Sequence, residues 1–453
     1  MKHLKLGKIQ WIALLVVSAM FVNLCSHMVL AAARDGNDPA QGTTAEATTA
    51  SEATTEATTA SEATTETTTE QQEETQSMGE YKAFWFSFYD YDSYRAKYKK
   101  RTAANFRTYF TGVVKKGKSL GMNRVIVQVR PFGDAIYKSK YFPWSKYISG
   151  KQGRNPGFDP LKIMVEVAHD NDMKIEAWVN PYRVTTGSTN YKKLAKNNQA
   201  RKWHAKKSTR RNVLSYGGSL YYNPSKKAVR TLITNGVKEI VENYDVDGIH
   251  MDDYFYPAFS SSNVNSAFDA KEYRASTMAK GKQNIVSFRR EQVNMLVKAI
   301  HRAVKSIDPS VTFGISPAGN IDNLTSRYSY YVDINKWLNS SDYVDYICPQ
   351  IYWGFKHPYA KFDRVTNRWM NAAKSKKVKV YIGIAVYRAG HNIGAGSAER
   401  REWRSDANIL KKQVQYARKK GCDGFAFFDY QDLKSKKSAK AVKQLKKLSL
   451  IHI

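Results

Sequence analysis

The sequence predicts an α/β protein folded as a (β/α)8 TIM barrel, and three observations favour this class. Short apolar runs alternate with amphipathic segments from residue 81 onward, which is typical of a parallel sheet with crossover helices. Eight such repeats occur, and eight is the number that closes a barrel. No glycine-rich phosphate fingerprint follows the first run, so an open doubly wound sheet is the less favoured alternative.

The predicted strands are the eight short apolar runs. In chain order they cover residues 82–88, 124–130, 174–180, 246–252, 311–316, 344–350, 380–387 and 424–429. This barrel occupies a single domain, residues 79–453, and its length exceeds the roughly 250 residues typical of the fold. We expect the excess to form long loops at 184–222 and 256–284.

Helical patterns fill the intervals between the strands. Apolar side chains share one helix face in two clear examples: Phe106, Phe110, Val113 and Val114, and Val229, Ile233, Val237 and Val241. Asp159-Pro160 and Asn223-Pro224 each combine an N-cap side chain with proline at the first helical position, so we expect helices to begin there. Apolar residues within 439–445 predict a closing helix.

The chain begins with the features of an export signal, residues 1–33. Three lysines precede an apolar run at 9–22, and Ala31-Ala32-Ala33 resembles a cleavage site. We expect cleavage, no stable membrane span afterwards, and a secreted protein at the cell surface or cell wall. The alternatives are an uncleaved anchor and lipidation at Cys25, whose neighbours fit a lipoprotein site poorly.

Residues 34–78 predict a disordered spacer rich in Thr, Ala and Glu. Its tract at 43–77 carries eight Glu and no Lys or Arg, and it has no large apolar residue with which to build a core. Residues 78–453 then carry 68 Lys and Arg against 30 Asp and Glu, a formal net charge of +38.

This charge indicates a polyanionic neighbour. For a secreted protein, which we expect to be a monomer, that neighbour is an anionic cell-wall polymer and not nucleic acid. The alternative is that lysine-rich helix faces only keep the protein soluble.

The alternation of a barrel strand predicts which side chains face inward. In 246–252, Ile249 and Met251 suit the helix layer, so His250 and Asp252 point into the barrel, with Asp252 at its C-terminal mouth. The same phase directs several polar and aromatic side chains inward on three other strands: Gln128, Arg130, Glu176, Trp178, Asn180, Tyr346, Cys348 and Gln350.

Six motifs at strand ends resemble a known family. They are "VRPFGDAIYKSKYFPWS", "EAWVNPYR", "NPSKKAVR…IVENYDVDGIHMDDYFYP", "GISPAGN", "DYICPQIYWGF" and "GFAFFDYQDL". Their order is similar to that of the glycosyl-hydrolase-like family related to glycoside hydrolase family 10. The resemblance implies a secreted or lipoprotein (β/α)8 hydrolase acting on cell-wall glycan, such as peptidoglycan strands stripped of stem peptides. Glu176, a position that is often His in similar sequences, departs from the pattern.

Glycoside hydrolysis commonly requires two carboxyl groups, one protonated and one ionised. Ordinary family 10 enzymes place Glu at the ends of strands four and seven, but here strand seven ends "GIAVYRAG". We expect Asp252 to be the general acid, with Asp253 raising the pKa of one member of the pair. The alternative for Asp253 is a loop cap or an arginine partner.

The second carboxylate is expected to be Asp134, ahead of Asp429 and Glu176. An Asx turn is the alternative for Asp134, and a buried pair with His250 or Arg130 is the alternative for Glu176. A substrate-assisted route, in which an N-acetyl group is the nucleophile, would need only one strong acid. We expect neither a metal nor a cofactor, because no HxxxH pair occurs.

The predicted substrate-binding residues are polar or aromatic side chains near strand ends, and core packing is the alternative for each: Arg130, Asn180, Arg183, Gln350, Tyr352, Trp353 and Asp429. The sequence thus predicts a polysaccharide hydrolase. The alternatives are a non-catalytic glycan-binding barrel and a metal-dependent polysaccharide deacetylase.

Overall fold

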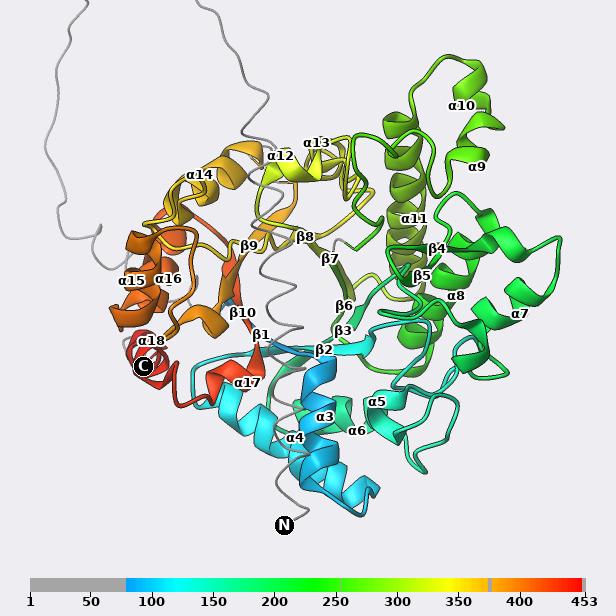
Figure 1. The fold of residues 1–453 in the computed structure, drawn as a ribbon. Helices are drawn as coiled ribbons and strands as arrows, with labels where there is room; N and C mark the ends of the chain where they lie inside the picture. Colours follow the sequence, from blue (N-terminus) through cyan, green and yellow to red (C-terminus); the bar gives the residue numbers. More distant parts are fainter. Residues whose placement is uncertain (1–78, 253, 374–376, 450–453) are drawn as a thin grey trace, which may run out of the picture. The chain divides into compact units, whose positions relative to one another are not determined.

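The computed structural model describes residues 79–252, 254–373 and 377–449, and it contains a closed barrel of eight parallel strands (Figure 1). Around the ring the order is β1-β10-β9-β8-β7-β6-β3-β2, and β2 pairs with β1 to close it. The bounds are β1 (Tyr81–Phe86), β2 (Arg124–Arg130), β3 (Lys174–Val179), β6 (Gly248–Asp252), β7 (Thr312–Ser316), β8 (Tyr346–Ile347), β9 (Lys379–Ala385) and β10 (Gly424–Phe428). The predicted barrel is confirmed.

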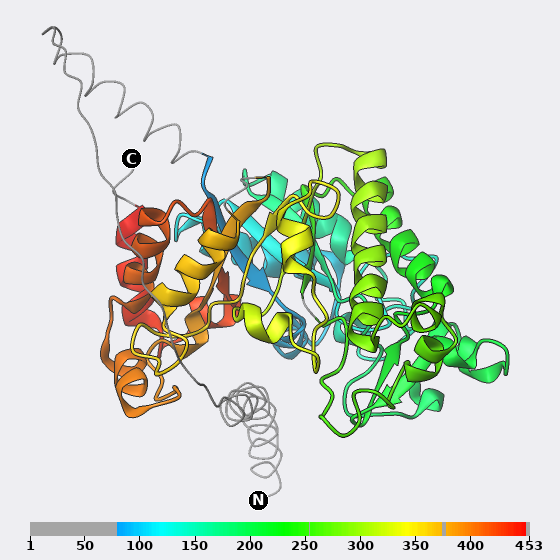
Figure 2. The same cartoon turned by 90° about the horizontal axis from the view of Figure 1, so that it is seen from above.

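Helices form the outer layer around these strands (Figures 1 and 2). The longer ones are α3 (Phe88–Lys97), α4 (Ala103–Lys118), α6 (Pro160–His169), α8 (Lys227–Asn243), α11 (Ile285–Ile307), α14 (Phe362–Ala372), α15 (Ser397–Ser405), α16 (Ile409–Lys419) and α18 (Ala439–Ser449). The shorter ones are α5 (Lys146–Ser149), α7 (Gln199–Ala205), α9 (Ala270–Arg274), α10 (Thr277–Lys280), α12 (Ile321–Leu324), α13 (Ile334–Leu338) and α17 (Tyr430–Leu433), with 3-10 turns η1 (Tyr191–Lys193), η2 (Arg210–Asn212) and η3 (Val386–Arg388).

One of the two predicted helix starts is correct. The Asp159 carboxylate accepts a hydrogen bond from the backbone N of Lys162, and Pro160 is the first residue of α6. The prediction for Asn223 is wrong, because α8 begins four residues later. The Asn223 side chain accepts hydrogen bonds from the backbone N (3.1 Å) and Oγ (2.7 Å) of Ser225, so it stabilises the turn before the helix.

The predicted long loop at 184–222 follows the carboxyl end of β3 and contains an antiparallel hairpin, β4 (Val213–Tyr216) and β5 (Ser219–Tyr222). Gly217 and Gly218 form its turn with φ of +52° and +72°, a conformation that favours glycine. The residue pair Arg183 and Tyr221 forms an antiparallel bridge between this hairpin and the chain leaving β3. The hairpin therefore holds the backbone of Arg183 beside the barrel mouth.

The second predicted loop, 256–284, follows β6 and is fixed to α11. The Arg289 guanidinium donates to the Asp269 carboxylate at 2.8 Å, and both side chains are fully buried. The same guanidinium lies 4.2 Å from the centre of the Phe259 ring. Both long loops thus lie at the C-terminal end of the strands, where barrel enzymes carry their sites.

The barrel interior is filled by buried side chains, half of them aromatic. They are Tyr81, Ala83, Trp85, Ile126, Trp178, Tyr346, Cys348 and Ala426. Gly314 leaves room for one of them, because a Cβ at that position would lie 2.0 Å from the Tyr346 ring. Ile249 and Met251 belong to the larger apolar cluster against the helices, as predicted.

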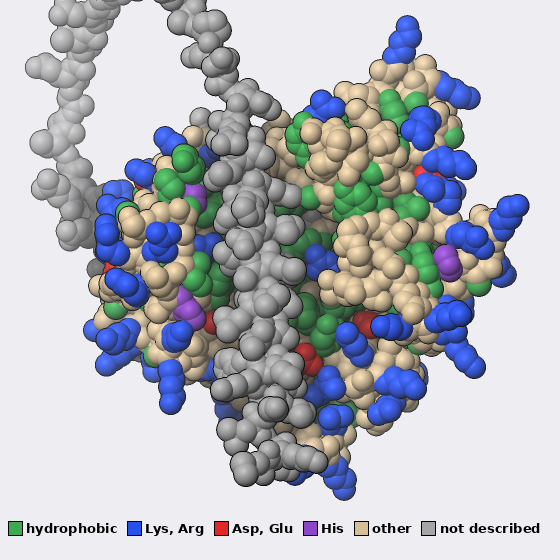
Figure 3. All heavy atoms as spheres, in the orientation of Figure 1, with side chains coloured by type: hydrophobic (Ala, Val, Ile, Leu, Met, Phe, Trp, Pro, Cys, Tyr) green, Lys and Arg blue, Asp and Glu red, His purple; other side chains and the backbone are tan. Residues whose placement is uncertain are grey.

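The predicted signal (1–33), the predicted spacer (34–78) and Asp253 lie outside the described residues. None of the helices in the described ranges combines the length and apolar content needed to cross a membrane. Lysine and arginine side chains are spread over the face seen in Figure 3, where acidic side chains are few.

Candidate functional site

Asp252 is the last residue of β6 and its carboxyl group lies at the barrel mouth, as predicted. One carboxylate oxygen accepts hydrogen bonds from the indole N of Trp178 (3.3 Å) and from the amide N of Asn180. The other accepts from the backbone N of Tyr254 at 3.3 Å. Three N–H donors therefore converge on a side chain that is only 2% exposed.

A chain of amides fixes the direction of the Asn180 hydrogen bond. The backbone N of Phe88 can only donate, and it donates to Oε1 of Gln128 at 2.9 Å. The Gln128 amide N then donates to Oδ1 of Asn180 at 2.6 Å, which leaves the Asn180 amide N to donate to Asp252. Gln128 is thus a positioning residue that was absent from the predicted site.

The environment of Asp252 suits a group that gains and loses a proton near neutral pH. Burial raises the pKa of Asp252 to about 6. The positive charge of Arg183 and the three N–H hydrogen bonds lower that pKa and so oppose the effect of burial. A carboxyl group with this pKa can act as an acid or a base at pH 6.

A buried network supports the floor of the mouth. The Trp85 indole N donates to Nε2 of His250 at 3.2 Å, and Nδ1 of His250 lies 2.7 Å from the Tyr346 hydroxyl. Burial lowers the pKa of His250 to about 3, so the imidazole is neutral. Since Nε2 accepts from an obligatory donor, the hydrogen is on Nδ1, and the Tyr346 hydroxyl in turn donates to Glu176.

Glu176 is part of this floor and not of the mouth. Its side chain is fully buried, and Oε1 accepts a hydrogen bond from Arg124 at 3.0 Å. Burial raises the pKa of Glu176, while the charge of Arg124 lowers it. The cation paired with Glu176 is therefore Arg124 and not Arg130. The expected neighbour His250 is present, with Nδ1 4.0 Å from Oε2 of Glu176, and Tyr346 connects the two by hydrogen bonds.

The inward direction predicted for Arg130 is wrong. The pairing register of β2 and β3 shifts between Gln128 and Arg130, so that Arg130 lies opposite Val179, an outward-facing residue. Its guanidinium donates to both carbonyl oxygens of the 180–181 turn (2.8 and 2.9 Å) and lies 4.5 Å from the centre of the Phe142 ring. Arg130 therefore stabilises the turn that presents the Asn180 side chain.

Arg183 lies beside Asp252, as expected from its place after β3. Its guanidinium carbon is 4.0 Å from the centre of the Tyr254 ring. The Arg183 charge also lowers the pKa of Tyr89, Tyr147 and Tyr221, and burial raises all three more strongly. The guanidinium thus lies against the Tyr254 ring, and its charge acts on three further tyrosines from separate segments.

The motif after β8 contributes one more ring to the mouth. Tyr352 is half-buried, with its ring centre 5.9 Å from that of Phe428 at the end of β10. The Gln350 amide N donates to the carbonyl oxygen of Ser316 at 2.9 Å, which ties the ends of β7 and β8 together. The half-buried Trp353 packs against the larger apolar cluster of the helix layer.

Asp429 belongs to a group of three carboxyl groups at the ends of β1 and β10, of which Asp90 and Asp429 are buried and Asp432 is half-buried. It accepts hydrogen bonds from the backbone N of Gln431 (3.1 Å) and from Oγ of Ser87 (3.3 Å). Ser87 also donates its backbone N to Asp90 at 2.7 Å. Burial raises the pKa of Asp90 and Asp429, and burial with the Asp429 charge raises the pKa of Asp432 to about 8.

The order of the strands places Asp429 across the mouth from Asp252. β10 and β6 are four strands apart in either direction around the eight-stranded ring. Strands about 4.8 Å apart with a tilt of about 36° give a ring about 15 Å across between opposite backbones. The two carboxyl groups therefore belong to opposite walls of the barrel.

Asp134 has partners within its own loop. Its carboxylate accepts a hydrogen bond from the Gln152 amide N at 2.8 Å, and the side chain is buried. Burial raises the pKa of Asp134, and hydrogen bonds from Gln152 and Ser145 oppose that rise. Within the described part of the chain, no hydrogen bond connects Asp134 with Asp252.

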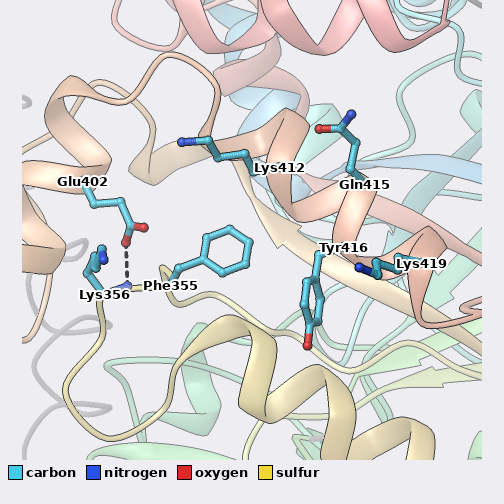
Figure 4. A pocket seen from close by; sticks show the side chains of 7 residues that line it. All are labelled: Phe355, Lys356, Glu402, Lys412, Gln415, Tyr416 and Lys419. Atoms are coloured by element: carbon cyan, nitrogen blue, oxygen red, sulfur yellow. Dashed lines mark hydrogen bonds between the residues drawn. The ribbon is translucent and has the colours of Figure 1, made fainter.

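A separate surface pocket of about 420 Å³ lies between the loop after β8 and α15 and α16 (Figure 4). Its lining comprises Phe355, Lys356, Glu402, Lys412, Gln415, Tyr416 and Lys419. The single carboxylate there, Glu402, accepts the backbone N of Lys356 at 2.9 Å. A lone carboxylate among lysines does not provide the acid and base of a hydrolase, so the mouth is the better candidate.

Comparison with known proteins agrees with this geometry. Residues 83–403 match the family described as Glycosyl hydrolase-like 10. The chain belongs to this family. This match confirms the family resemblance that the sequence motifs predicted. It also agrees with the predicted class of enzyme, a glycosidase. In the described residues, no group of three His, Cys, Asp or Glu side chains is arranged to hold a metal ion.

Two curated relatives are similar over most of the barrel. Glycosyl hydrolase YngK of Bacillus subtilis (strain 168) is 38% identical over 293 residues, which cover 61% of this chain and 55% of YngK. Glycosyl hydrolase DigH of Escherichia coli (strain K12) is 33% identical over 311 residues, or 65% of this chain and 69% of DigH. The chain therefore spans about half the length of the first relative.

Two solved structures show the same fold at low identity. The glycoside hydrolase domain of PgaB (BpsB) from Bordetella bronchiseptica aligns with a TM-score of 0.50 at 13% identity, over 80% of this chain and 98% of that domain. A cold-adapted β-galactosidase from Rahnella sp. R3 aligns with a TM-score of 0.51 at 9% identity, over 82% of this chain and 56% of that enzyme.

Proposed function

We propose that this protein is a glycoside hydrolase that cleaves cell-wall polysaccharide, with peptidoglycan glycan strands as its substrate. The observation that carries the proposal is the buried Asp252 carboxyl group at the barrel mouth, whose pKa is about 6. Its family and two relatives named glycosyl hydrolases support the reaction class. The tyrosines around the mouth are suitable surfaces for sugar rings.

In this proposal Asp252 is the general acid. Its protonated form donates to the glycosidic oxygen as the bond to the anomeric carbon breaks, so that the leaving sugar departs as an alcohol. The resulting carboxylate accepts hydrogen bonds from Trp178 and Asn180, which stabilise the charged form. A water molecule adds its oxygen to the anomeric carbon and loses a proton to a base, and Asp252 regains a proton from the bulk solvent.

The second chemical group is proposed to be Asp429, on the opposite wall. Glu176 is excluded as that group because it is fully buried and paired with Arg124. Carboxyl groups on opposite walls leave room for a water molecule and therefore suit inversion of the anomeric configuration. In inverting enzymes the two carboxyl groups are typically about 6.5–9.5 Å apart. A substrate-assisted route would use an N-acetyl group in place of Asp429 and would retain the anomeric configuration. Asp253 stays a prediction.

The test compares turnover of purified glycan strands by the wild type, by Asp252→Asn and by Asp245→Asn. Asp245 is a matched control because its side chain is 92% exposed and lies outside the mouth. We expect Asp252→Asn to abolish product release while retaining glycan binding, and the control to behave as the wild type. Turnover by Asp252→Asn at the wild-type rate would refute the assignment.

Product analysis by mass spectrometry and NMR separates the alternatives. A new reducing end identifies the bond that is cut, and its initial configuration distinguishes inversion from retention. Binding without turnover by the wild type would favour the glycan-binding barrel. Release of acetate that EDTA abolishes would favour the deacetylase.

We also propose that the protein is exported and lies against anionic cell-wall polymers. The charge of +38 on residues 78–453 and the predicted signal at 1–33 support this location. Retention on isolated cell walls should weaken as salt rises, because screening reduces the attraction between exposed charges. Equal retention on DNA in the same salt would contradict a preference for wall polymers.

A further inference from the structure

The guanidinium of Arg183 has a fixed position at the mouth, where its positive charge lowers the pKa of Asp252. Its backbone is held by the bridge to Tyr221, and its charged group lies 4.0 Å from the centre of the Tyr254 ring. Within residues 79–252, 254–373 and 377–449, this guanidinium makes no hydrogen bond or ion pair. The side chain is partly exposed at the mouth, so its five N–H donors can reach a bound molecule.

Three other arginines near the barrel donate hydrogen bonds to groups of the protein, although Nε of Arg124 and Nη1 of Arg130 have no hydrogen-bond partner in the described residues. Arg124 donates to Glu176, Arg289 to Asp269, and Arg130 to two carbonyl oxygens. Each of these has an evident structural purpose. Arg183 differs because its guanidinium forms no hydrogen bond within the described residues, while the face of the Tyr254 ring holds it in place and leaves its edge open.

We propose that Arg183 binds a carboxylate carried by a sugar unit in the mouth, so that the enzyme selects an acidic polysaccharide. This inference rests on the proposed glycoside hydrolase function and adds the chemical class of its substrate. A single planar guanidinium matches the two oxygens of one carboxylate with parallel hydrogen bonds. The tyrosines around Arg183 provide surfaces for the apolar faces of that sugar.

Two sugars that carry such a carboxylate serve as the test. It is the C6 group of a hexuronic acid, or the lactyl group ether-linked to muramic acid when no peptide is attached. In both, reduction of the carboxylate to an alcohol removes the charge and leaves the ring unchanged. Matched pairs of acidic and reduced oligosaccharides from each source therefore isolate the contribution of the carboxylate.

The experiment measures binding of these pairs by calorimetry, with Asp252→Asn as the background so that the sugar is not consumed. We expect the acidic form of one source to bind about 10- to 100-fold more tightly than its reduced form, the range for a hydrogen bond to a charged group. Adding Arg183→Gln should remove this difference, whereas Arg183→Lys should retain part of it.

The exposed Arg404 of α15 provides the control, because Arg404→Gln removes one positive charge outside the mouth. It should leave the preference for the acidic form intact. Equal binding of acidic and reduced sugars, a preference that survives Arg183→Gln, or no binding of either source would overturn the inference. A carboxylate preference without turnover by the wild type would uphold the inference while refuting the proposed hydrolysis.

Discussion

Replacing Arg124 by Met removes the partner of the buried Glu176 carboxylate. The ion pair is 3.0 Å long, Glu176 is fully buried and the Arg124 side chain is 14% exposed. Removing one partner of such a pair typically costs about 3–5 kcal/mol in the free energy of unfolding. We expect a loss of this size for Arg124→Met at pH 8, measured by urea unfolding followed through tryptophan fluorescence. Arg368→Met is the control, because the side chains of Arg368 and its partner Asp322 are both at least half exposed. Such an exposed pair contributes about 1 kcal/mol or less to the free energy of unfolding.

The pH dependence of this loss provides a second criterion. Arg124 lowers the pKa of Glu176, so its removal raises that pKa further above the value in the unfolded chain. The folded variant then binds a proton that the unfolded chain releases, and its stability falls as pH rises. The loss should therefore be smaller at pH 5 than at pH 8, and Arg124→Met with Glu176→Gln should recover most of it. Equal losses at both pH values, or a double variant no more stable than the single one, would refute the reasoning.

Three further predictions concern the mouth, the carboxyl group cluster and the interior. If Asp252 donates a proton, kcat/KM should fall as pH rises through about 6. Gln128→Met should move this fall to higher pH. The reason is that the substitution frees the Asn180 amide, whose hydrogen bond lowers the pKa of Asp252. Asp432 has a pKa of about 8, so the protein should lose stability as pH rises from about 4 to 8, and Asp432→Asn should lessen that loss in thermal melts. Gly314→Ala should lower stability by about 1–3 kcal/mol in urea unfolding, since its Cβ would overlap the Tyr346 ring. The first prediction would be contradicted by a pH profile that Gln128→Met leaves unchanged. The second would be contradicted if Asp432→Asn lost as much melting temperature between about pH 4 and 8 as the wild type, and the third by an unchanged urea midpoint for Gly314→Ala.

Strand alternation was sufficient to predict the barrel and the position of Asp252. The phase of 246–252 placed Ile249 and Met251 against the helices and Asp252 at the mouth, and the structure agrees. The same rule failed for Arg130, because one extra residue in β2 turns its side chain outward. A register shift of this kind depends on pairing with β3, which the local pattern of β2 does not contain.

Long-range partners were the least predictable part of the site. Asp90 joins Asp429 only because the first and last strands of the barrel are neighbours, whereas Asp432 lies three residues after Asp429. The amide chain through Gln128 joins the end of β1 to β3 by way of β2. The inward phase of Gln128 was visible in the sequence, but its role requires the positions of both partners.

The most direct measurement of the central claim compares two substrates of Asp252→Ala. One is the natural glycan, whose leaving sugar needs a proton, and the other is an aryl glycoside whose acidic phenol leaves without one. If Asp252 is the general acid, the variant should lose about 10²- to 10⁴-fold in kcat/KM on the glycan and far less on the aryl glycoside. Equal losses on both substrates would show that Asp252 does not donate the proton.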